Sequence, residues 1–129
     1  MIIILDADDD CPAQLGPSLL KRCQQVTKLP CLVVIANREI ESWLLGSKDS
    51  LGGICGVKHN AVSPAEPEKI RGAKEHLTRN MEPGKRYLAS DDLPRLLEKI
   101  DIHLTGQHCP SFKRFFQKLS GIMLPLAGG

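Results

Sequence analysis

The chain has 129 residues, of which 42% are hydrophobic and 25% are charged. The length predicts a single domain over residues 1–129, and the composition argues against a disordered or fibrous chain. The net charge of +2, from 17 basic and 15 acidic side chains, is too balanced to indicate a nucleic-acid or membrane surface by itself.

Cysteine usage and the first residues predict a cytoplasmic location. The five cysteines include no CxxC pair, and their odd number leaves one thiol unpaired in any complete disulfide scheme. The apolar segment 2–5 has no basic flank and is far too short for a signal peptide or a membrane span. We therefore expect a reducing compartment and no membrane association.

The first 36 residues predict a βαβ unit. Segments 2–5 and 31–36 are continuous, apolar and rich in β-branched residues, which is the pattern of parallel strands buried on both faces. The segment between them, "GPSLLKRCQQVTK", has the length of a helix, and Pro30 prevents its continuation. The predicted apolar stripe of this helix is formed by Leu19, Leu20, Cys23 and Val26.

The remainder of the chain predicts helices and one long loop. Asn37 is a candidate N-cap for a helix that extends to Gly46. Segment 48–67 is rich in Gly, Ser and Pro and predicts a loop, with "GGICGVK" as a candidate short strand. Further helices are predicted at 68–81, at "DDLPRLLEKI" with Asp91 as its cap, and at "SFKRFFQKLSGIM" with Ser111 as its cap.

The sheet predicted in this way is small. Two parallel strands among many helices would leave long unpaired edges. Because a central type of strand begins at residue 2, we expect either a fold that lacks its N-terminal strand or a sheet completed by a second copy. The apolar segment "GIMLPLAGG" also favours a homo-oligomer, which would cover it.

Four carboxylates follow the first predicted strand in "MIIILDADDDCP". Carboxylates packed this closely repel one another, so a bound cation is expected. Ligands of open parallel sheets bind beyond the carboxyl ends of the strands, where both "DADDD" and "NREIE" lie. Mg²⁺ or Mn²⁺ is commonly held by one or two carboxylates with waters and substrate phosphate. We therefore predict Asp6 and Asp8 as metal ligands, with Asp10 as a further ligand.

A second group of residues is predicted to act on a phosphorylated substrate. Glu39 and Glu41 differ by about 200° around a regular helix, so we favour Glu39, which is nearer the strand end, as the catalytic carboxylate. The equally weighted alternative is that both glutamates only complement a positive helix N-terminus, worth about 0.3 to 1 kcal/mol each. Arg71 and Lys74, from the basic segment 69–86, are predicted to stabilise developing charge.

The N-terminal acidic segment partly matches two other acidic motifs. An EF-hand loop starting at Asp6 would require Gly at Cys11 and Glu at Pro17, which excludes this calcium site. An apolar strand that ends in DxD also resembles the haloacid-dehalogenase phosphatases, in which the first Asp is a nucleophile. Asp10 departs from that pattern, which has Thr or Val at this position, so the phosphatase is only the second enzymatic hypothesis.

Four segments in this order, "LDADDDCP", "ANREIESWLL", "PEKIRGAKEHL" and "CPSFKRFF", resemble a bacterial family, domain of unknown function 4276. The resemblance covers nearly the whole chain and implies a Toprim-like α/β fold, with Asp6 and Asp8 at the position of the metal-binding DxD. Toprim domains carry another glutamate after an earlier strand, and no such residue precedes Asp6. The resemblance therefore implies either that the chain is N-terminally truncated relative to the family or that Glu39 replaces the missing glutamate. Members of the family are often encoded beside ATPases, which implies an ATPase partner.

The sequence thus predicts an α/β, Toprim-like domain with a small parallel sheet and flanking helices. We expect it to bind a divalent metal and, if it is an enzyme, to hydrolyse nucleic-acid phosphodiester bonds with the help of that metal. The competing hypothesis is a non-catalytic binding or regulatory subunit that partners an ATPase.

Overall fold

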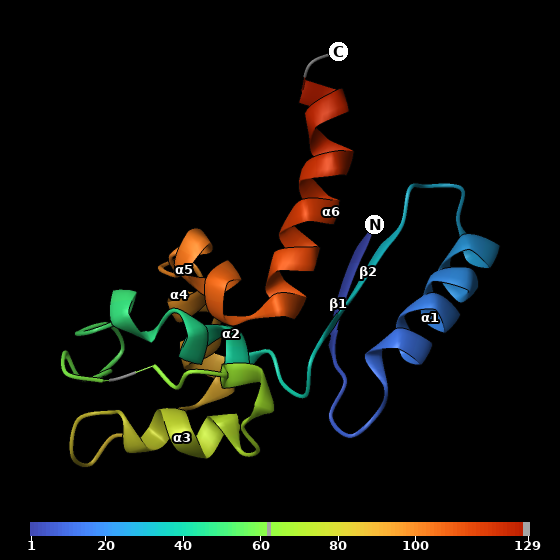
Figure 1. The fold of residues 1–129 in the computed structure, drawn as a ribbon. Helices are drawn as coiled ribbons and strands as arrows, with labels where there is room; N and C mark the ends of the chain where they lie inside the picture. Colours follow the sequence, from blue (N-terminus) through green and yellow to red (C-terminus); the bar gives the residue numbers. More distant parts are fainter. Residues whose placement is uncertain (62, 128–129) are drawn as a thin grey trace.

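The computed structural model describes residues 1–61 and 63–127 of the chain. These residues form a parallel two-stranded sheet with flanking helices, which confirms the predicted α/β class (Figure 1). The elements in chain order are β1 Ile2–Asp6, α1 Pro12–Val26, β2 Leu32–Ala36, α2 Glu41–Gly46, η1 Lys48–Ser50, η2 Pro67–Lys69, α3 Ala73–Arg79, α4 Ala89–Leu97, α5 Ile102–His108 and α6 Pro110–Ala127, where η marks a 3₁₀ helix.

The β1–α1–β2 unit is formed as predicted, and β2 is its buried strand. The two strands pair in parallel, with Ile2 opposite Leu32 and Asp6 opposite Ala36. Figure 1 shows α1 and α6 on opposite sides of the strands. On one face of β2, Leu32, Val34 and Ala36 pack against aromatic residues of α6. On the other face, Ile35 lies against Gly16 of α1. Side chains alternate along a strand, so the two helices cover the two faces of β2.

The prediction that β1 is buried on both faces is wrong. Ile2, Ile4 and Leu5 are 51%, 38% and 42% exposed, respectively. The apolar pattern is the same in both strands, but α6 packs on β2 and the helices leave much of β1 uncovered. Burial of a strand depends on the elements that cover it, and the composition of the strand does not determine their position.

Several helix boundaries differ from those predicted. α1 begins at Pro12, earlier than expected, because proline is well tolerated in the first helical turn. Val26, assigned to its apolar stripe, is 82% exposed. Asn37 does not cap α2, since that helix begins at Glu41 with Ile40 in the cap position. The helix predicted at 68–81 is confined to α3, because Gly72 takes a left-handed conformation (φ 68°) directly before it.

Among the described residues, the C-terminal half contains one α-helix more than predicted. The additional helix is α5, which is capped by Asp101 through a hydrogen bond from the Leu104 amide (2.9 Å). Asp91 is not the cap of α4, because Asp92 accepts the hydrogen bond from the Leu88 amide in the cap position (2.8 Å). Ser111 lies inside α6, which begins one residue earlier and includes most of the "GIMLPLAGG" segment.

Two apolar clusters hold these elements together. The first packs α2 against α3, α4 and the loop that follows α2; its buried residues include Leu44, Leu45, Leu77 and Leu96. The candidate strand in this loop is reduced to one antiparallel bridge between Val57 and Met81. The second cluster joins β2 to α6 around Trp43. Since α2 contributes to both clusters, it fixes the carboxyl end of β2 relative to α3 and α4.

Candidate functional site

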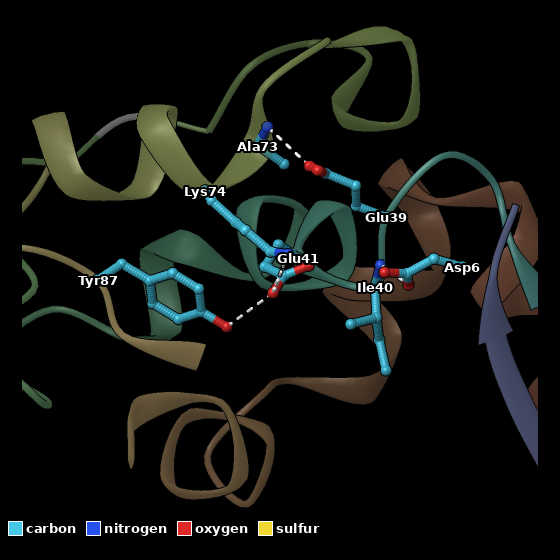
Figure 2. A network of polar contacts seen from close by, with 7 residues as sticks. All are labelled: Asp6, Glu39, Ile40, Glu41, Ala73, Lys74 and Tyr87. Carbon is cyan, nitrogen blue, oxygen red and sulfur yellow. Dashed lines mark hydrogen bonds and ion pairs between the residues drawn. The ribbon is translucent and has the colours of Figure 1, made fainter. Parts of the chain in front are cut away.

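Carboxylates that end β1 or follow β2 lie near the carboxyl ends of the sheet. Asp6 is the last residue of β1, and Glu39 and Glu41 lie in and just after the turn that follows β2. Because α2 begins only at Glu41, the angular argument against using both glutamates does not apply. Figure 2 shows these three residues around the start of α2.

Asp6 is half-buried and ties the end of β1 to the start of α2. Its Oδ1 accepts a hydrogen bond from the amide of Ile40, the residue in the cap position of α2, at 2.7 Å. Asp6 therefore satisfies the amide of the cap residue itself, which in a capping box donates to the side chain three residues further on.

Glu39 complements the N-terminus of a helix other than the one predicted for the two glutamates. The helix concerned is α3, because Glu39 Oε2 accepts a hydrogen bond from the Ala73 amide at 2.9 Å. Ala73 is the first residue of α3, and Gly72 before it has no side chain to cap that helix. Glu39 therefore joins the turn after β2 to a helix 34 residues later in the chain.

Glu41 is the most deeply buried carboxylate of this group, with 1% of its surface exposed. The hydroxyl of Tyr87 donates a hydrogen bond to its Oε1 (3.1 Å), and Lys74 Nζ lies 4.0 Å from the same oxygen. Its Oε2 has no hydrogen-bond partner among the described residues. Burial raises the pKa of Glu41, and the charge of Asp6 raises it further, whereas Lys74 and hydrogen bonds lower it.

Tyr87 responds to the same environment. Its pKa is raised by burial and then by the neighbouring charge of Glu41, so the phenol keeps its proton and remains a donor to that carboxylate. The sequence pattern favours Glu39 over Glu41 and does not single out Tyr87. If α2 is expected to begin as late as Glu41, the helical angle no longer excludes Glu41 from the site. No local pattern indicates Tyr87.

The remaining predicted residues lie at the surface beside this cluster. Asp8, Asp9 and Asp10 are exposed, and Asp8 adopts a left-handed backbone (φ 51°) while its amide donates to the Arg38 carbonyl (2.8 Å). Arg71 forms an exposed ion pair with Asp9 at 3.3 Å. A small cavity of about 160 Å³ is lined by Asp8, Asp9, Arg38, Glu39, Ile70, Arg71 and Gly72.

The carboxylates do not form a complete metal cage. Within residues 1–61 and 63–127, no group of three or more His, Cys, Asp or Glu side chains is placed to hold a metal ion. The structure brings Glu41 and Asp6 close enough to interact electrostatically, whereas Asp10 is exposed in the turn after β1. The set Asp6, Asp8 and Asp10 therefore stays a prediction, as does the catalytic role of Glu39, Arg71 and Lys74.

The capping role of Glu39 leads to a testable prediction. We expect Glu39→Ala to lower the free energy of unfolding by about 1 kcal/mol, because the Ala73 amide loses its acceptor. Glu39→Gln keeps an oxygen acceptor and should cost less. Urea denaturation measures both, with Glu82→Ala, a change at an exposed glutamate, as control. Equal stability of Glu39→Ala and the wild type would show that the contact contributes nothing.

The fold and the strand-end carboxylates together define an α/β protein with an acidic cluster beyond a parallel sheet. The chain belongs to the family DUF4276, domain of unknown function, which matches residues 2–120. No curated protein and no solved structure matches the chain. In the part of the chain that the structure describes, no helix combines the length and the apolar character needed to cross a membrane.

Proposed function

We propose that this protein binds Mg²⁺ or Mn²⁺ beyond the carboxyl ends of β1 and β2, and that it acts on phosphodiester bonds of nucleic acid. Asp6 and Asp8 are the proposed ligands, with Asp10 or Glu39 as a further ligand. The observation that carries the proposal is the fully buried Oε2 of Glu41, which lacks a partner among the described residues. The resemblance to Toprim domains is consistent with this location.

The chemistry of the cluster fits a hard cation. A buried carboxylate oxygen without a partner is costly, and such groups usually reveal a missing water or ion. Asp6 adds a second negative charge that already raises the pKa of Glu41. A divalent cation held by Asp6 would offset this repulsion, and one of its bound waters would supply the partner that Glu41 Oε2 lacks.

The adjacent cavity favours a phosphate of a polymer over an enclosed small molecule. Its volume of about 160 Å³ is below the roughly 300 to 1,000 Å³ typical of small-molecule pockets. Arg38 and Arg71 contribute positive charge to its lining. The lining also carries Asp8, Asp9 and Glu39, so a phosphate would need the bound cation as well as these arginines. A single phosphate group fits this size, while the rest of a nucleic-acid strand would lie across the surface.

The residues of the chain have separate roles in this proposal. A bound divalent ion would polarise a phosphate oxygen and activate a water. Arg71 is free to contact the phosphate, because its exposed ion pair with Asp9 is of a kind worth at most about 1 kcal/mol. Lys74, half-exposed beside Glu41, can neutralise charge on that carboxylate or on the substrate. Glu39 would accept a proton near the strand end.

Calorimetric titration with Mn²⁺ tests the metal site directly. We expect saturable binding by the wild type and affinity at least about tenfold lower for Asp6→Asn and Asp8→Asn, since each loses a charged ligand. Asp91→Asn, a change at an exposed acid in α4, is the matched control and should bind as the wild type does. Absence of binding by the wild type, or equal binding by all four proteins, would remove the metal site.

A further inference from the structure

The edge of β2 that faces away from β1 lies in a slot between two helices. A cavity of about 580 Å³ is lined by residues of α1, of β2 and of α6, together with two residues from the adjoining turns, Cys11 and Asn37. Because α1 and α6 cover opposite faces of β2, a cavity that touches both helices must pass around an edge of that strand. No residue of β1 lines the cavity, so this edge is the one opposite β1.

The hydrogen-bond register shows which backbone groups face the slot. The Leu32 amide donates to the Met1 carbonyl at 2.9 Å. At the other end of the pair, the Ala36 carbonyl accepts from the Ala7 amide at 3.0 Å. In a parallel pair, every second residue of a strand directs its amide and its carbonyl toward the neighbouring strand. The amides and carbonyls of Val33 and Ile35 therefore point away from β1.

The outward amides and carbonyls of Val33 and Ile35 are in a position that favours hydrogen bonds to another strand. Ile35 is only 9% exposed, and an unpaired backbone group in a buried position costs about 1 to 3 kcal/mol. β2 has five residues at about 3.3 Å each, so the edge offers roughly 16 Å of strand. Gly16 and Ala13 on the α1 side of the slot are small enough for another backbone to approach.

The charge of the slot indicates what kind of strand would enter. Arg114 and Lys118 are the charged residues in its lining, and both are exposed on α6. They are four residues apart in a helix, which separates them by about 6 Å along the axis. Two residues of a strand span about 6.6 Å, so acidic side chains at alternate positions of an extended segment would match this spacing.

We propose that the free edge of β2 binds an extended segment of a partner protein by strand addition. The segment carries acidic residues at alternate positions, which face Arg114 and Lys118, and apolar residues between them, which face α1. Its backbone pairs with Val33 and Ile35, which supplies affinity, while the side chains supply specificity. This binding does not depend on a metal at Asp6.

A synthetic peptide tests the proposal on the full chain. The probe is a short, blocked, fluorescent peptide in which valine alternates with aspartate, and the comparison peptide has lysine in place of aspartate. Fluorescence anisotropy should show saturable binding of the acidic peptide and binding at least about tenfold weaker for the basic one. No saturable binding at millimolar acidic peptide, or equal affinity for the two peptides, would overturn the proposal.

Variants locate the binding to the slot. The double variant Arg114→Glu with Lys118→Glu should weaken binding of the acidic peptide by about tenfold or more, because the attraction becomes repulsion. Lys113→Glu, the same change on α6 outside the slot, should bind as the wild type does. Val33→Pro removes an outward amide and spares the pairing with β1, so it should also weaken binding. Unchanged affinity of the double variant would place the peptide elsewhere and reject the slot.

Two other occupants would give distinct results. If a second copy fills the slot, light scattering should show a wild-type oligomer that becomes monomeric in the Arg114→Glu, Lys118→Glu variant. If the slot binds nucleic acid, a single-stranded oligonucleotide should displace the acidic peptide. Either result would reject a partner protein as the occupant.

Discussion

Trp43→Ala is expected to lower the free energy of unfolding by about 3 to 5 kcal/mol, the range typical of removing a large buried aromatic side chain. Trp43 is 2% exposed and belongs to the cluster that joins β2 to α6. Its ring packs edge-on against Phe112, with centroids 5.2 Å apart, and is stacked with Phe115 at 5.9 Å. The substitution would leave a cavity where α2, β2 and α6 meet.

A polar contact adds to the effect at Trp43. The indole Nε1–H donates to Ser111 Oγ at 2.9 Å, and the Ser111 hydroxyl in turn donates to the buried Glu68. Trp43→Phe keeps much of the packing and removes the indole donor, so its cost should be smaller than that of Trp43→Ala.

Chemical denaturation followed by far-ultraviolet circular dichroism measures these costs. Phe116→Ala is the matched control, because Phe116 lies on the same helix as Phe112 and is 40% exposed. It should cost less than about 1.5 kcal/mol. A cost for Trp43→Ala no greater than that for Phe116→Ala would mean that this cluster does not stabilise the fold.

The second large effect concerns catalysis. With Mn²⁺, we expect weak cleavage of single-stranded or duplex DNA at most, and a loss of at least about 100-fold in any such activity in Asp6→Asn, because metal assistance is worth several kcal/mol. The asparagine retains an oxygen that can accept the Ile40 amide, so the start of α2 should remain intact. Loss of activity with an unchanged denaturation midpoint would therefore be chemical in origin.

Further variants separate the roles of the two glutamates. Glu39→Gln should abolish the activity if Glu39 handles a proton, and Glu41→Gln should reduce it if the buried carboxylate supports the metal. Activity that survives Asp6→Asn would indicate another site or a contaminant. Metal binding without cleavage under any condition would favour the non-catalytic binding or regulatory subunit. Activity that requires Asp6 and is indifferent to Glu39 would remove the role of Glu39 while retaining the metal site.

The sequence alone determined the secondary structure of the β1–α1–β2 unit and the placement of carboxylates at the strand ends. The continuous apolar segments and the helix between them determined the β1–α1–β2 unit, because strand and helix periodicities are set within a few residues. Their order also placed Asp6 and Glu39 beyond the same edge of the sheet, since parallel strands end on the same side. Trp43 was predictable as a core anchor for a similar reason, because large aromatic residues in such a chain are usually buried.

Only the tertiary structure decided the environments of these residues. Glu39 accepts from an amide 34 positions later, and Tyr87 reaches Glu41 across 46 positions. The same apolar pattern gave a buried β2 and an exposed β1, because α6, which packs on β2, comes from the far end of the chain. The burial of the strands, the pKa of Glu41 and the slot at the edge of β2 all depend on which distant elements pack together. A local sequence pattern does not determine that packing.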